Sequence, residues 1–208
     1  MRTKNLLSRL RDCPRDERGA INVVLIGVLV VILTLGAAII VPIGHTLAER
    51  RSATTAADAA ALAGADYCAD RLEDAYSAAM RSTDDKEFWA HFGKPVSFYC
   101  GNATTEAQHM ALANNASLTS FRMTIGLRFQ ASITRHEEVT EVGGHLSSRA
   151  TAKMDMRTGA CVSGGLFGIR ISGTCRTSPP TVSPGSGWPL EPGTYSPVAR
   201  IDTELVVS

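Results

Sequence analysis

The longest apolar stretch of the chain runs from Ile21 to Ile43 and contains no charged residue. Its only polar side chains are those of Asn22 and Thr34. At about 1.5 Å of rise per helical residue, such a stretch spans the hydrocarbon core of a bilayer, about 30 Å. We therefore expect a transmembrane helix over residues 21–44. The alternatives are a cleaved secretory signal, whose apolar region is usually shorter, and a helix buried in a soluble core.

The charges on either side of this stretch are unequal. Only Arg50 and Arg51 follow it closely. Six basic residues precede it: Arg2, Lys4, Arg9, Arg11, Arg15 and Arg18. Basic residues beside a span stay in the cytoplasm. We therefore expect residues 1–20 to form a cytoplasmic basic arm of a single-pass cell-membrane protein whose C-terminal domain is extracytoplasmic. A basic arm in this position indicates topology and contact with lipid, so we expect no nucleic-acid partner.

The pattern changes after the apolar stretch. Residues 45–81 are rich in Ala, Leu, Glu and Arg, which favour helices. Apolar residues recur there at steps of three and four and form one stripe: Leu62, Ala65, Ala69, Leu72, Tyr76 and Ala79. We expect an Ala-rich extracytoplasmic helix that packs against a folded domain. Its small side chains also allow packing against other copies of the chain, and the candidate positions are Ala56, Ala60, Leu62 and Ala63.

Residues 82–176 have the pattern of an α+β ectodomain. We expect helices over residues 84–92 and 106–118, with a brief strand over 96–100. Alternation of apolar and polar residues predicts one strand over 121–133 and an antiparallel neighbour over 146–156. The segment 177–208 is rich in Pro and Gly and ends in a further strand near residues 199–207. The expected architecture is a transmembrane helix that continues into a long amphipathic helix, packed on a small antiparallel β-sheet.

The chain has five cysteines. Cys13 lies in the arm, where a cytoplasmic thiol stays reduced, and the other four lie where an oxidising compartment lets them pair. Four cysteines allow three pairings. We favour Cys161–Cys175, which closes a short Gly-rich loop, and therefore Cys68–Cys100. No two cysteines have C-x-x-C spacing and no histidine stands near one at ligand spacing, so we expect no metal site.

Catalytic motifs are missing from the sequence. It contains no G-x-S-x-G, no H-E-x-x-H and no phosphate-binding glycine motif. His136 is followed by Glu137 and Glu138, a combination typical of a solvated charge cluster. We expect neither an enzyme nor a cofactor.

Three features of the N-terminal quarter resemble one family. They are Arg18-Gly19-Ala20 before the apolar stretch, Leu47-Ala48-Glu49-Arg50-Arg51 after it, and the Ala-rich run from Ala56 to Ala65. Residues 15–66 thereby resemble TadE/TadG-like proteins of tight-adherence (Flp) pilus assembly, and the TadG-like members more closely. The resemblance implies a membrane-anchored, pilin-like accessory component in assembly of a bacterial Flp/Tad-type pilus or a related secretion system. Its partners would be other pilus or secretion-system subunits, with self-association through the N-terminal helix.

The resemblance also bears on processing. Pilin-like relatives are cut after a glycine that precedes the apolar segment, and Gly19 stands at that position here. Those relatives carry a glutamate five residues after the cut, whereas this chain has Val24. This departure favours a permanently anchored protein over a processed pilin. The alternative function is a membrane-tethered extracellular binding or adhesion domain, in which residues 82–208 carry the activity.

Overall fold

The computed structural model describes residues 17–139, 144–179 and 193–206, without the side chains of residues 17–22 and 39–46. The chain divides into two compact units, Met1–Leu47 and Ala48–Ser208, which we describe separately as the first and second unit. Most of the predicted basic arm, including Cys13, and much of the Pro-rich segment lie outside the described residues.

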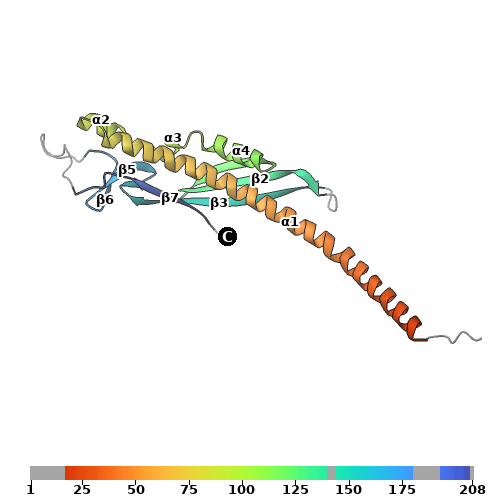
Figure 1. Cartoon of the computed structure of the whole chain (residues 1–208). Coiled ribbons are helices and arrows are strands. Elements are labelled where there is room, and N and C mark those ends of the chain that lie inside the picture. Colours follow the sequence, from red (N-terminus) through yellow and green to blue (C-terminus); the bar gives the residue numbers. More distant parts are fainter. Residues whose placement is uncertain (1–16, 140–143, 180–192, 207–208) are drawn as a thin grey trace, which may run out of the picture. The chain divides into compact units, whose positions relative to one another are not determined.

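Helix α1, Glu17–Met80, begins in the first unit and ends in the second (Figure 1). In the first unit, every large apolar side chain from Val23 to Leu35 whose surroundings are described is more than half exposed. Within the described part of the chain, no helix combines the length and the apolar character that crossing a membrane requires.

The second unit is an α+β domain built on the C-terminal part of α1. Three short helices follow α1 in the sequence: α2 Asp85–Ala90, α3 Val96–Tyr99 and α4 Ala103–Ala113. An antiparallel four-stranded sheet has the order β1-β2-β3-β7. Its strands are β1 Ala116–Thr124, β2 Arg128–Val139, β3 Gly144–Thr158 and β7 Arg200–Leu205.

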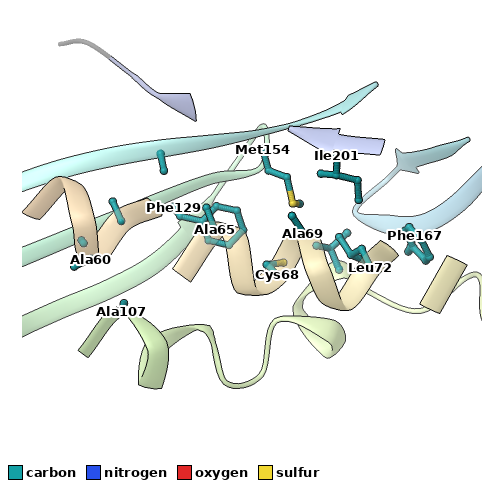
Figure 2. Close-up of a cluster of buried hydrophobic side chains, with 14 of the residues drawn as sticks. Ala60, Ala65, Cys68, Ala69, Leu72, Ala107, Phe129, Met154, Phe167 and Ile201 are labelled. Atoms are coloured by element: carbon teal, nitrogen blue, oxygen red, sulfur yellow. The ribbon is translucent and has the colours of Figure 1, made fainter. Parts of the chain in front are cut away.

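The core of the second unit lies between α1 and the buried face of this sheet. Figure 2 shows Ala65, Cys68, Ala69 and Leu72 of α1 beside Phe129, Met154 and Ile201 of the strands, with Ala107 of α4 pointing toward the same helix. Small side chains on α1 let both the sheet and the short helices approach its backbone. At Gly64 an added Cβ would lie 3.1 Å from the carbonyl oxygen of Ala103 and closer still to the Phe121 ring.

A second antiparallel sheet, β4-β5-β6, replaces the loop expected over residues 161–175. Its strands are β4 Ala160–Ser163, β5 Leu166–Ile171 and β6 Thr174–Arg176. The Gly-rich composition that indicated a loop supplies its turns instead, because Gly164, Gly165 and Gly173 have positive φ. Phe167 and Ile169 of β5 are fully buried, so this segment contributes to the core.

The single strand predicted over residues 121–133 is wrong, because the structure has a hairpin there. Strands β1 and β2 are joined by a turn at Ile125, Gly126 and Leu127, and the last two have φ of 78° and 56°. Phe121 pairs with Ala131 and Met123 with Phe129. A three-residue turn keeps odd-numbered residues opposite odd-numbered ones, so the alternation of apolar and polar residues continues through the turn without a break.

Two other elements differ from the expectation, one in its type and one in its end. Residues 96–99 form helix α3 rather than a strand, since an alternation this short does not distinguish the two. The helix predicted over 106–118 is α4, which ends at Ala113. Asn115 then has a positive φ of 54°, a conformation that asparagine tolerates, and β1 begins at Ala116.

Candidate functional site

Helix α1 contains most of the candidate functional residues. Polar contacts join it to the C-terminal strand β7. The Glu73 carboxylate accepts a 2.7 Å hydrogen bond from the backbone N–H of Ile201 on β7. Thr203 of the same strand donates its hydroxyl to Asp66. Since β7 is at the edge of its sheet, Glu73 satisfies a backbone N–H that an edge strand otherwise leaves to solvent.

A tyrosine and a disulfide hold α1 near its end. The fully buried Tyr76 donates its hydroxyl to the carbonyl oxygen of Ser196 at 2.5 Å. Burial raises the pKa of Tyr76 well above its ordinary value, and Tyr195 adds to this effect. The disulfide Cys68–Cys100 joins α1 to the residue after α3, with 4.6 Å between the two Cα atoms. The rest of the second unit therefore fixes α1 through covalent, polar and apolar contacts.

The second disulfide, Cys161–Cys175, links β4 to β6. The two disulfides are the pairs that the sequence favours. Cys68 and Cys161 are buried in the domain, whereas Cys100 and Cys175 are partly exposed. Each bridge closes a loop of the unfolded chain and stabilises the folded domain by about 3 kcal/mol in the loop-entropy model.

A small cluster of charged groups in the second unit centres on Asp202 of β7. Arg157 and Arg200 hydrogen-bond to Asp202 on β7 and lower the pKa of its carboxyl group. Burial raises the pKa of Asp58 on α1. Among residues 17–139, 144–179 and 193–206, no group of three or more His, Cys, Asp or Glu side chains is arranged to hold a metal ion.

The structure places the predicted packing positions mostly inside the domain. Ala56 and Ala60 are fully buried within the second unit, and Leu62 and Ala63 are half-buried. Of the alternatives that the sequence leaves open, packing against the chain's own domain is therefore the one that Ala56 and Ala60 adopt. The predicted cleavage position Gly19 lies in α1, and Val24 is 66% exposed.

The matched part of the chain begins at that same glycine. Residues 19–67 match the family model described as putative Flp pilus-assembly TadE/G-like. The TadE/TadG-like match covers the first unit's helix and the Ala-rich part of α1, and it stops before Cys68. The resemblance found in the sequence is thus confirmed over this segment. The description is of pilus assembly and not of an enzyme family, and it associates the segment with Flp pili and so with the cell envelope. No curated protein and no solved structure matches the chain.

Sequence reasoning missed the role of the α1 carboxylates. Asp66 and Glu73 lie off the apolar stripe of residues 45–81, yet they bind β7. The only signal in the sequence was their spacing of seven residues, two helical turns, which places both on one side of α1. That spacing does not reveal which strand they contact.

Proposed function

We propose that the chain is a membrane-anchored, pilin-like accessory subunit in assembly of a bacterial Flp/Tad-type pilus or a related secretion system. The observation that carries the proposal is the TadE/TadG-like match over residues 19–67. The match includes both the exposed apolar part of α1 and the first of the α1 residues that are buried in the core of the second unit, Ala53 to Ala65.

The exposed apolar surface of the first unit supports a membrane anchor. Large apolar side chains from Val23 to Leu35 are 51% to 71% exposed in the isolated chain. Complete burial of a fully exposed side chain of this kind contributes about 1.5–3 kcal/mol, and covering the exposed part of these side chains contributes a share of that. The chain itself supplies no cover for them among the described contacts of the first unit, whereas a lipid bilayer or the apolar helices of other subunits would supply it. The basic residues before Ala20 orient the anchor with its N-terminus in the cytoplasm.

Burial of Ala56 and Ala60 supports different roles for the two parts of α1. The face of α1 that carries these residues is occupied by the chain's own domain. Contacts with other pilus subunits and self-association are therefore assigned to the apolar residues 21–43. Val24 in place of a glutamate supports a chain that keeps Gly19 uncut and stays in the membrane.

A deletion strain tests the proposal. Loss of the chain should abolish or sharply reduce surface pili, counted by electron microscopy, and the full chain should restore them. The matched variant carries residues 48–208 behind a cleavable secretory signal, so that it has the folded domain but no anchor, and it should not restore pili. Normal pilus numbers in the deletion strain would refute a role in assembly.

The alternative, a tethered binding or adhesion domain, gives a different result in the same strain. Pilus number and length would be normal, and attachment of cells to a surface would be lost. The anchor is tested separately by resistance of the chain to alkaline extraction from membranes. Orientation follows from labelling of Cys13 with a membrane-impermeant maleimide, which should react only after the membrane is opened.

A further inference from the structure

A cleft of about 470 Å³ lies on the second unit between α1 and the segment that contains α2 and α3. One wall is formed by Tyr67, Arg71 and Asp74, which succeed one another at steps of four and three residues on α1. The opposite wall includes Phe98 of α3 and Asn102, the residue that precedes α4. The cleft is separate from the apolar part of α1 to which pilus assembly is assigned.

The disulfide Cys68–Cys100 joins the two walls of the cleft. Cys68 follows Tyr67 on α1, and Cys100 lies two residues after Phe98. The hydroxyl of Tyr99 also donates a 2.6 Å hydrogen bond to the carbonyl oxygen of His91, another residue of the lining. The disulfide fixes the separation of the walls and the Tyr99–His91 bond braces one of them, so a ligand would not have to order them, and such preorganisation favours binding.

Aromatic rings form part of the cleft surface. Phe98 is 64% exposed although its ring is fully apolar. Its ring centroid lies 5.3 Å from that of Tyr99, with the two rings nearly perpendicular. On the α1 wall, the centroid of the Tyr67 ring lies 6.0 Å from the Arg71 guanidinium carbon. The Lys94 ammonium also lies over the Phe98 ring, 5.0 Å from its centroid, so a ligand ring that stacks on Phe98 displaces Lys94 or takes the other face of the ring.

The polar groups of the cleft suit a ligand that both donates and accepts hydrogen bonds. Arg71 and Asp74 form a 2.9 Å ion pair, and their side chains stay 45% and 70% exposed, so both keep free hydrogen-bonding positions. The Asn102 side chain forms no cap on α4, which leaves its amide available to a ligand. The charges of the paired Arg71 and Asp74 cancel, and the Lys94 ammonium over the Phe98 ring adds one positive charge beside the cleft.

A neutral pyranose matches these groups. Its vicinal hydroxyls both donate and accept hydrogen bonds, and its ring has an apolar C–H face. We propose that this cleft binds a neutral saccharide, with a sugar ring against Phe98 and its hydroxyls bonded to Arg71, Asp74 and Asn102. The proposal goes beyond a role in pilus assembly and does not depend on it. Binding is measured on the purified chain, so either proposal can fail without the other.

The test uses the full, non-reduced chain in lipid nanodiscs and saturation-transfer NMR with glucose, galactose, mannose, N-acetylglucosamine and short neutral oligosaccharides built from them. At least one should bind saturably with a Kd below about 10 mM. Phe98→Ala should weaken that binding by up to about tenfold, the upper range for one aromatic contact. Ile125→Ala is the matched control, because Ile125 is 98% exposed on the β1–β2 turn and does not line the cleft.

Circular dichroism establishes that each variant is folded. If Phe98→Ala does not fold, Asn102→Ala decides the matter, since that side chain is exposed and does not cap α4. No saturable binding by any of these sugars would overturn the proposal. So would equal affinity of the wild type and of the folded cleft variants, or a preference for inorganic phosphate over the sugars.

Discussion

Gly159 offers a sharp test of how the second unit is packed. It lies between β3 and β4, is buried, and has φ of +70°. A Cβ at this position would lie 2.6 Å from the carbonyl oxygen of Val198 and 2.9 Å from the hydroxyl oxygen of Tyr76. Neither neighbour is free to move, because one is backbone and the other is a buried ring hydrogen-bonded to Ser196.

The cost of Gly159→Ala therefore has two parts. The left-handed backbone conformation costs a residue with a Cβ about 1–2 kcal/mol. Overpacking against Val198 and Tyr76 costs about 1–3 kcal/mol more. Gly126→Ala is the matched control, since Gly126 has φ of +78° but nothing within 4 Å of an added Cβ. It should show only the first cost, so the two variants should differ by about 1–3 kcal/mol in the free energy of unfolding.

The assay is thermal unfolding of the detergent-solubilised, non-reduced full chain, followed by far-ultraviolet circular dichroism. For a domain of this size, the difference corresponds to a Tm about 2–12 °C lower for Gly159→Ala than for Gly126→Ala. Equal Tm values for the two variants, or a higher value for Gly159→Ala, would refute the packing described at this junction.

Three further predictions use the same unfolding assay. Asp84→Ala should lower stability by about 0.5–2 kcal/mol, because its carboxylate caps α2 by accepting a 2.8 Å hydrogen bond from a backbone N–H, whereas Asp85→Ala should have a smaller effect. Ala60→Leu should cost about 1–3 kcal/mol by overpacking the core, and Ser77→Leu on the exposed face of α1 should stay within about 0.5 kcal/mol of wild type; equal effects would contradict the assignment of the buried face. In the folded chain Tyr76 keeps its proton at pH values above about 10, the ordinary pKa of tyrosine. In the unfolded chain its hydroxyl loses the proton near pH 10, so the free energy of unfolding should fall as the pH rises past about 10. Tyr76→Phe should make this alkaline loss smaller, and an unchanged pH profile would count against the burial of this hydroxyl.

The β1–β2 hairpin shows where a sequence pattern stops being informative. Alternation over residues 121–133 correctly identifies Phe129, Ala131 and Ile133 as buried, whereas Ile125, which continues the pattern, is 98% exposed in the turn. It does not show that the chain reverses at Gly126, because the turn preserves the parity of the pattern. Only the positive φ values of Gly126 and Leu127, stabilised once the two strands pair, reveal the turn.

The α1 helix shows the same limit in a different way. Its apolar stripe predicts a buried side, and Leu72, Tyr76 and Ala79 are fully buried. A stripe of small residues fits a sheet, a neighbouring helix or another copy equally well, since all of them need a close approach to the backbone. In the folded chain the stripe contacts both the sheet and the short helices. At Gly64 the remaining space is too small for a Cβ.

The sequence by itself determined the α+β class, the position of the long helix, the strands β3 and β7 and the segment that resembles TadE/TadG-like proteins, and it favoured one of the three possible cysteine pairings. These depend on local periodicity, composition and spacing, which the chain carries before it folds. Tertiary structure decided that Asp66 and Glu73 bind β7, that Ala56 and Ala60 lie in the core, and that a disulfide joins the walls of a cleft. These contacts join residues up to 137 positions apart, and no local pattern encodes which distant groups the folded chain brings together.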